Sequence, residues 1–119
     1  ISTIAAGEDG EIYNINGDTA AAYVAGALHA ERLIMMTDIA GILRDVNDPS
    51  SLIPEISINE AQELRASGVI SGGMIPKAEC CIKAITEGVH KVIIMDGRVP
   101  HSILIELLTD EGAGTMFVK

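Results

Sequence analysis

The chain has 119 residues, and 17 acidic against 8 basic side chains give it a formal net charge of −9. A chain of this length normally forms one domain with a hydrophobic core of its own. The negative charge and the 3% aromatic content argue against a nucleic-acid binder, which needs a basic surface and rings that stack on bases. No apolar run approaches the roughly 18 residues that a membrane span requires. Because the chain begins with Ile1 and shows no signal peptide, we expect a piece of a longer protein.

In chain order, the first expected elements are a hairpin and a helix. A Glu-Asp-Gly turn signal at residues 8–10 separates two short apolar stretches, so residues 1–15 are expected to be extended and paired. Residues 19–28 are rich in alanine and contain no proline, which predicts a well-buried helix. Asp18 is the expected N-cap of this helix.

A strand, a small hairpin and a second helix are expected next. Residues 32–36 contain four consecutive apolar side chains, which is typical of a central parallel strand covered on both faces. An Asn-Asp-Pro turn signal closes a hairpin that we expect over residues 39–46. Ser57 and Glu60 have the spacing of a capping box, so a helix is expected to begin there and to end before Gly68.

The remaining elements complete an alternating pattern. A helix is expected over residues 74–87, with a proline in its first turn and Gly88 after its end. Residues 92–95 predict a second buried strand, residues 100–108 a short helix and residues 114–118 a final strand. Strands that alternate with helices predict a single α/β domain, a sandwich with a mostly parallel sheet and right-handed crossovers.

The chain has two cysteines, Cys80 and Cys81, which are adjacent. Neighbours on a helix point about 100° apart, so the pair does not have the usual spacing of metal ligands, and a disulfide between them would be strained. We therefore expect two packed, reduced thiols, as in an intracellular protein.

Two loops are candidates for ligand binding, because ligands bind beyond the carboxyl ends of the strands in an open α/β sheet. Residues 37–43 follow the first buried strand with a polar pair and a glycine, although spacing alone favours an ordinary turn. Residues 69–77 place two glycines before a helix start, where free N–H groups and the helix dipole favour phosphate. Lys77 adds a positive charge there; a solvated surface lysine is equally compatible with the spacing, and no Walker A loop is present.

Two further segments carry polar side chains. Asn14, Asn16 and Asp18 alternate along a stretch expected to be extended, so they are expected to share one side, where Asp18 could orient a lysine. An ordinary helix cap is the alternative. In residues 96–101, His101 could serve as a catalytic base. No nucleophile lies at a recognisable spacing from it in the sequence, which favours a capping or ligand-binding role.

Five motifs, taken together and in this order, resemble the C-terminal half of the acetylglutamate kinases, a branch of the amino acid kinase family. They are NINGDTA (residues 14–20), TDIAGIL (37–43), GVISGGMIPK (68–77), DGRVPH (96–101) and TDEGAGTM (109–116). The resemblance covers the chain from about Glu11 onward, and the last two motifs separate it from carbamate kinases, aspartokinases and uridylate kinases. It implies a three-layer sandwich that forms the ATP-binding lobe of an enzyme of arginine biosynthesis. In the family reaction, the γ-phosphoryl group of ATP, which brings Mg²⁺, passes to the side-chain carboxylate of N-acetyl-L-glutamate.

The resemblance also implies roles for single residues. Lys77 and Asp18 are the implied catalytic residues: Lys77 neutralises charge on the nucleotide phosphates, and Asp18 holds the catalytic lysines in place. Asn14 and Asn16 are implied to bind N-acetylglutamate, and no metal site of the chain's own is implied. The implied nucleotide-binding residues are Thr37, Asp38, Gly41, Ile42, Leu43, Val69, Ile70, Ser71, Gly73 and Met74.

The C-terminal motif looks like the signature of the arginine-inhibited branch of the family, and it implies an inhibitor site at His101, Glu106, Gly112 and Gly114. That site would be half built here, because the N-terminal helix that completes it in the family is missing. A full-length enzyme of this branch is implied to be a cytoplasmic homo-oligomer, or a plastid one in a plant. Some arginine-sensitive members bind a PII-type signalling protein, and the sequence leaves that partner open.

Two departures from the family pattern stand out. Gly17 replaces the usual alanine, and the family's N-terminal half, with its other catalytic lysine, Gly-rich loops and substrate-binding arginine, is absent. We therefore expect the chain alone to be catalytically inactive or nearly so. Two alternatives remain: a non-catalytic module that binds nucleotide or arginine for regulation, and another amino acid kinase with a different acid as acceptor.

Overall fold

The structure is a computed structural model, and it describes all residues 1–119. A four-stranded mixed sheet forms the middle of the molecule. The strand order is β3-β5-β6-β4, with β3 parallel to β5, β5 antiparallel to β6, and β6 parallel to β4. Two of the three pairings are therefore parallel, which confirms the prediction of a mostly parallel sheet. The strands are β3 (Arg32–Thr37), β4 (Glu55–Ser57), β5 (Lys91–Asp96) and β6 (Gly114–Val118).

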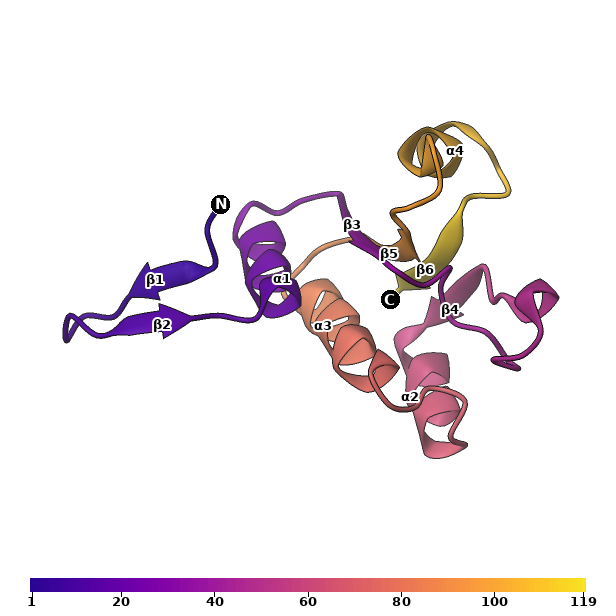
Figure 1. The fold of residues 1–119 in the computed structure, drawn as a ribbon, viewed down its shortest axis with the longest axis horizontal. Coiled ribbons are helices and arrows are strands. Elements are labelled where there is room, and N and C mark those ends of the chain that lie inside the picture. The colour runs from indigo at the N-terminus through magenta and orange to yellow at the C-terminus, as the bar shows by residue number, and fades with distance from the viewer.

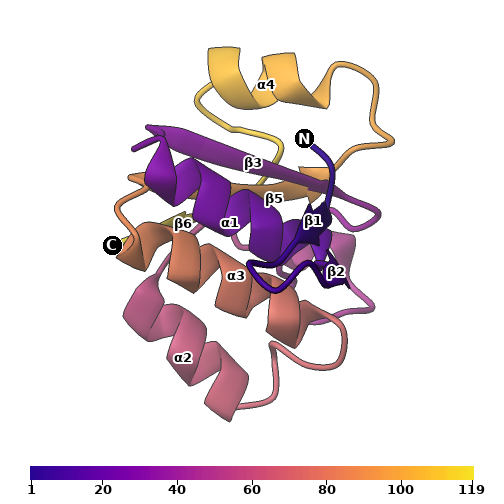
Figure 2. The ribbon, with the colours of Figure 1, turned by 90° about the vertical axis from the view of Figure 1, so that its left-hand side faces the viewer.

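Helices cover both faces of this sheet and complete the predicted three layers. Figure 2 shows α1, α2 and α3 on one face and α4 alone on the other. Their bounds are α1 (Gly17–Ala27), α2 (Ile58–Ala66), α3 (Met74–Thr86) and α4 (Ser102–Leu108). None of these helices has the length and apolar character that crossing a bilayer requires.

The strand β5 is the most deeply buried element of the molecule. Val92, Ile93, Ile94 and Met95 have no exposed surface, because β5 is paired on both edges and covered on both faces. The prediction of a second buried strand is thereby confirmed. Cys81, on α3, packs into the same core, and its burial raises the pKa of its thiol. Both cysteines are free thiols, as predicted.

The strand β3 was predicted to be central, and that prediction is wrong for this chain. It pairs only with β5 and lies at the edge of the sheet, where Met36 is half exposed. A continuous apolar run indicates that both faces of a strand are covered, but it does not indicate whether the strand has a neighbour on one edge or on both.

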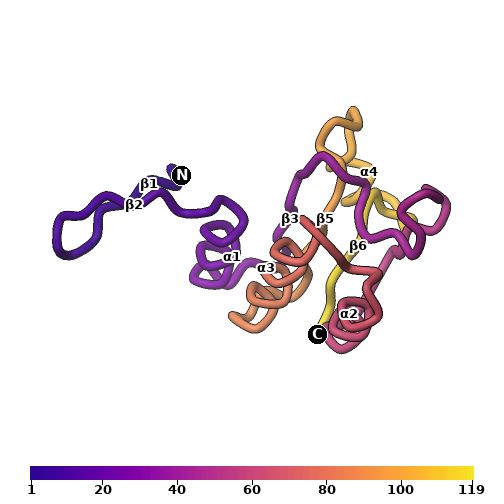
Figure 3. Tube along the Cα trace, turned by 60° about the horizontal axis from the view of Figure 1, so that its bottom comes forward, coloured from indigo at the N-terminus to yellow at the C-terminus, as the bar shows by residue number.

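The N-terminal hairpin is confirmed and projects from the body (Figures 1 and 3). It consists of β1 (Ile4–Ala6) and β2 (Ile12–Asn14), which pair antiparallel, and all six of these residues are exposed. At the other end of the chain, β6 finishes beside the start of α2, because Val118 pairs with Ser57 of β4 (Figure 3).

The start of α1 differs from the prediction. The N-cap is Asn16, not Asp18: the Asn16 side-chain oxygen accepts hydrogen bonds from the backbone N–H groups of Asp18, at 3.0 Å, and of Thr19, at 3.1 Å. The helix therefore begins at Gly17, and the extended stretch stops at Asn16 instead of reaching Asp18. Both residue types cap helices equally well, so sequence alone could not choose between them. Asp18 is left free for another partner.

The hairpin predicted over residues 39–46 is also wrong. The segment is an irregular loop with one isolated bridge, from Leu43 to Leu52, followed by the short 3₁₀ helix η1 (Pro49–Ser51). The strand β4 was not predicted, because it has only three residues, of which Ile56 alone is buried. The helix α4 begins at Ser102, two residues later than predicted, because His101 has a positive φ of 62°.

The predicted ends of α2 and α3 are confirmed. In the capping box, the Glu60 backbone N–H donates to the Ser57 hydroxyl and the Ser57 backbone N–H donates to the Glu60 carboxylate. Gly68, with φ of 83°, and Gly88, with φ of 107°, follow the two helices in the left-handed region that glycine tolerates best.

Ser57→Ala tests the capping box. It removes the hydroxyl that accepts the Glu60 N–H, so we expect the free energy of unfolding to fall by about 1 kcal/mol in urea titrations. The matched control is Ser67→Ala at the other end of α2, where the hydroxyl only donates to the Leu64 carbonyl. A Ser57 variant as stable as this control would contradict the capping role.

Candidate functional site

A cavity of about 640 Å³ opens at the carboxyl ends of β3 and β5. Three segments line it: the loop after β3, the start of α3 and the turn after β5. The two strands are parallel and pair Thr37 with Asp96 at their last residues, so the loops that follow them must lie side by side. This is the edge of an open α/β sheet at which ligands bind.

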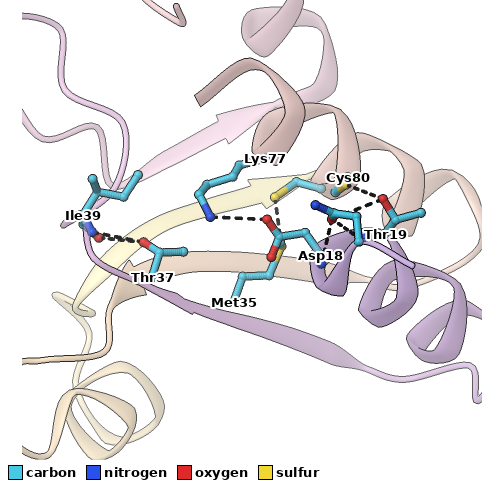
Figure 4. Close-up of polar contacts among 9 residues, drawn as sticks. Asp18, Thr19, Met35, Thr37, Ile39, Lys77 and Cys80 are labelled. Carbon is cyan, nitrogen blue, oxygen red and sulfur yellow. Dashed lines mark hydrogen bonds and ion pairs between the residues drawn. The ribbon is translucent and has the colours of Figure 1, made fainter. Parts of the chain in front are cut away.

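Lys77, which lines this cavity, belongs to an ion pair with a residue outside the lining. The ammonium nitrogen of Lys77, on α3, lies 3.3 Å from a carboxylate oxygen of Asp18, on α1 (Figure 4). Both side chains are about one-third exposed or less. One turn further along α3, the Cys80 sulfur lies 3.7 Å from the Thr19 hydroxyl, which shows that these two helices pack face to face here.

The N-terminus of α3 opens toward the same cavity. Gly73 stands at the N-cap position, and no side chain caps the helix. A Cβ atom built at Gly72 or Gly73 would have no neighbour within 4 Å, so the absence of side chains leaves the approach open. The N–H groups of Met74 and Ile75 already donate to the carbonyls of Ser71 and Gly72, so the attraction for an anion comes from the positive end of the helix dipole and the Lys77 ammonium, which lie together here.

The loop after β3 is anchored at its start by several hydrogen bonds. The Thr37 hydroxyl accepts from the backbone N–H of Ile39, at 3.1 Å, and donates to the carbonyl of the same residue (Figure 4). The Thr37 carbonyl accepts from the Gly97 N–H at 2.9 Å, and the Arg98 guanidinium donates to the Asp38 carbonyl at 2.6 Å.

The far end of this loop is anchored by Thr115, a buried residue of β6. Its hydroxyl accepts from the Ile42 N–H at 2.8 Å and donates to the Ile53 carbonyl at 2.7 Å. A Cβ atom at Gly41 would lie 2.5 Å from this hydroxyl, and Gly41 also has a positive φ of 150°. Only glycine therefore lets the loop approach β6 this closely.

Asp96 and Arg98 form a two-pronged ion pair in the turn after β5. The Arg98 guanidinium donates to one Asp96 oxygen at 2.9 Å and to the other at 2.8 Å. These hydrogen bonds and the one from the Arg98 backbone lower the pKa of Asp96 to about 2. Both residues line the cavity.

Most of the ten residues proposed from the sequence for a nucleotide site line this one cavity. The two exceptions are Thr37, which anchors the loop, and Ile70, which is buried in the core. Sequence reasoning did not assign Asp96 and Arg98 to this site, although their position after the second parallel strand was a usable signal. It also missed Val46 and Pro49, which reach the cavity through the irregular loop that was predicted as a hairpin.

Asn14 and Asn16 lie outside this cavity. Asn14 is an exposed residue of the projecting strand β2, and Asn16 is occupied as the cap of α1. The Asn16 side chain nevertheless accepts from the Asp18 N–H, so the end of the hairpin leads directly to the Asp18–Lys77 pair.

A second cavity, of about 440 Å³, lies between α4, the loop that follows it and the strands β4 and β6. Glu106 is nine-tenths buried, and its carboxylate accepts from the Ala113 N–H at 2.7 Å. A Cβ atom at Gly112 would lie 2.8 Å from that carboxylate, and one at Gly114 would collide with the Ile94 carbonyl. Of the four residues predicted for an inhibitor site, these three line the cavity, whereas His101 does not.

The first cavity defines the class of protein: an open α/β protein with a lysine and a helix N-terminus placed to receive an anionic group at a strand edge. The family follows from comparison with known proteins. The model of the amino acid kinase family matches residues 2–96, and the chain belongs to this family.

Similar proteins agree with this assignment. The chain is 55% identical to an acetylglutamate kinase of Heliobacterium modesticaldum over 119 residues, and 52% identical to one of Nostoc sp. over 118 residues. It spans 40% of the length of each relative, so these proteins are much longer than the chain. A crystal structure of N-acetylglutamate synthase from Neisseria gonorrhoeae, complexed with coenzyme A and L-arginine, matches with a TM-score of 0.88 and 32% identity. That match covers 100% of the chain and 27% of the synthase.

Thr115→Val tests the anchor of the cavity loop. The variant keeps the side-chain shape but leaves the buried Ile42 N–H and Ile53 carbonyl without a partner, so we expect a loss of about 1–3 kcal/mol in the free energy of unfolding. Thr86→Val is the control, because that exposed hydroxyl donates only within its own helix. Equal urea midpoints for the two variants would show that the Thr115 hydroxyl anchors nothing.

Proposed function

We propose that this chain is the ATP-binding lobe, the C-terminal half, of an acetylglutamate kinase. The full-length enzyme would transfer the γ-phosphoryl group of ATP to the side-chain carboxylate of N-acetyl-L-glutamate in arginine biosynthesis. The observation that carries the proposal is the Asp18–Lys77 pair beside the N-terminus of α3, at the cavity that residues of three of the five sequence motifs line. The similarity of the chain to acetylglutamate kinases, at 52–55% identity, supports this proposal.

The cavity has an apolar part and a polar part, as a nucleotide site requires. Apolar side chains from the loop after β3 and from α3, among them Ile39, Val46 and Met74, offer a surface for the base. Gly73 and Lys77 lie at the polar end, where the positive end of the helix dipole and an ammonium group suit the phosphates. Mg²⁺ would enter with ATP, because it is usually held through substrate phosphates and water.

The proposed reaction requires charge neutralisation more than covalent help from the protein. A carboxylate oxygen of N-acetylglutamate attacks the γ-phosphorus in line, and the bond to the β–γ bridging oxygen breaks. The products are an acyl phosphate and ADP. Lys77 stabilises the negative charge on the transferring and leaving phosphates, and Asp18 positions the Lys77 ammonium through their ion pair.

We also propose that this lobe needs the rest of the enzyme. In the family that the sequence resembles, another lysine, Gly-rich loops and a substrate-binding arginine belong to the other half. N-acetylglutamate would bind between the halves, with Asn14 and Asn16 contributing from this side. Exposed apolar side chains on α4, such as Leu104 and Leu108, are consistent with further assembly into a homo-oligomer.

The second cavity is proposed as an arginine site. Its lining carries both charges: Glu55, Glu106 and Asp110 suit the guanidinium and ammonium groups of arginine, and Arg32 and Lys91 suit its carboxylate. The L-arginine named for the N-acetylglutamate synthase structure supports this proposal. A regulatory module without catalysis would keep one or both cavities, whereas another amino acid kinase would keep the first and accept a different acid.

Lys77→Ala in the full-length protein that carries this sequence tests the kinase proposal. We expect kcat for acetylglutamate phosphorylation to fall about 10²–10³-fold, because a group that stabilises transition-state charge is removed. Stability should change little, since the lysine is partly exposed and an ion pair in contact with solvent adds little to stability. Lys83→Ala, whose ammonium lies over Tyr23 away from the cavity, is the control. Activity on carbamate or aspartate instead of acetylglutamate would favour the other-kinase alternative, and an unchanged kcat would rule out the role of Lys77.

Glu106→Gln in the same full-length protein tests the arginine site. The carboxylate is buried beside the cavity, so its neutralisation should raise the arginine concentration for half-maximal inhibition at least about tenfold, or about 1.4 kcal/mol of binding free energy. Glu63→Gln, an exposed residue of α2, is the control. Full activity of the unmodified enzyme at saturating arginine would contradict the proposal.

A further inference from the structure

The turn after β5 contains the one sequence motif that the proposed function does not use. Arg98 is more than two-thirds exposed, yet its guanidinium is held by three hydrogen bonds. Two of them go to the two oxygens of Asp96, and the third goes to the backbone carbonyl of Asp38, which follows the neighbouring strand. An exposed arginine held in this way joins two loops that are 60 residues apart in sequence.

The two loops are already in close contact beneath this arginine. The Gly97 N–H donates to the Thr37 carbonyl at 2.9 Å, and a Cβ atom at Gly97 would lie 3.1 Å from the Cβ of Met36. The turn is therefore pressed against the end of β3, and the Arg98 side chain continues this contact outward along the loop. Asp96 keeps the guanidinium plane oriented toward the Asp38 carbonyl.

Only an arginine can make this set of bonds. The planar guanidinium presents several donors in a fixed geometry, so it can meet both oxygens of one carboxylate and a carbonyl beside them. A lysine ammonium carries the same charge but is a single point, and it cannot reach all three acceptors together. The geometry therefore uses the shape of the side chain, not its charge alone.

We propose that Arg98 is a positioning residue of the nucleotide site, which fixes the loop of residues 38–42 in the conformation that receives the nucleotide. This inference rests on the proposed function of the cavity. Thr115 holds the far end of the same loop, so Arg98 and Thr115 clamp it from opposite ends. Without Arg98, the loop would sample other conformations and the nucleotide would bind only the fraction that is correctly formed.

The test compares the full-length protein that carries this sequence with its Arg98→Ala and Arg98→Lys variants. The probe is a non-hydrolysable ATP analogue with Mg²⁺, titrated by calorimetry, and amide hydrogen exchange is measured at Ile39 and Gly97. We expect both variants to bind about tenfold more weakly and both amides to exchange faster. Arg65→Ala is the control, because Arg65 pairs with Glu79 at the surface of α2 and α3, and it should bind as the unmodified protein does.

The outcomes separate the inference from the proposed function. Wild-type affinity in Arg98→Lys would show that charge alone matters, and wild-type affinity in Arg98→Ala would show that Arg98 has no role; either result overturns the inference while the nucleotide site stands. Absence of binding by the unmodified full-length protein would count against the proposed function instead. In that case, unchanged exchange rates in Arg98→Ala would overturn the clamp as well, and faster exchange would support it.

Discussion

The parallel pairing of β3 with β5 is the constraint on which the rest of the structure depends. The register places Thr37 opposite Asp96, so both strands end at the same edge of the sheet. The helices α1 and α3 each precede one of these strands and run back across the sheet, which brings their N-termini to that edge. Asp18 and Lys77 stand near these two N-termini, and the contact between α1 and α3 joins them. One strand pairing thus brings together the segments that line the first cavity and places α1, with Asp18, beside them.

The Asp18–Lys77 ion pair at this edge offsets an unfavourable interaction between Lys77 and the dipole of α3. A lysine in the first turn of a helix is unfavourable, because the positive end of the dipole prefers an acid there. Asp18 offsets this, and it is free to do so because Asn16 caps α1 in its place. Partial exposure of both side chains keeps the cost of removing charge from water small. The arrangement leaves the lysine held in place yet open to a further anion from the cavity.

Most signals that act within a few residues were readable from the sequence, the cap of α1 being an exception, whereas several that act across the sheet were not. The capping box of Ser57 and Glu60 and the glycine after α2 depend only on their neighbours in sequence, and they were predicted correctly. The hairpin predicted over residues 39–46 failed because Thr115, more than 70 residues away, holds Ile42 in an irregular loop. The edge position of β3 depends on which strands exist elsewhere. The motifs of the candidate site were recognised in the sequence. The hydrogen bond from Arg98 to the Asp38 carbonyl could not be predicted from it, because the two residues are brought together only by the pairing of β3 with β5.

The strand β6 connects the two cavities through the alternation of its side chains. Successive residues of a strand face opposite sides of the sheet. Gly114 and Met116 therefore line the second cavity beside α4, whereas Thr115 between them faces the other way and holds the loop of the first cavity. Gly114 also packs against the Ile94 carbonyl without room for a side chain, which fixes the backbone at this point. A substitution in β6 therefore acts on one cavity or the other according to the face of the sheet on which its side chain lies.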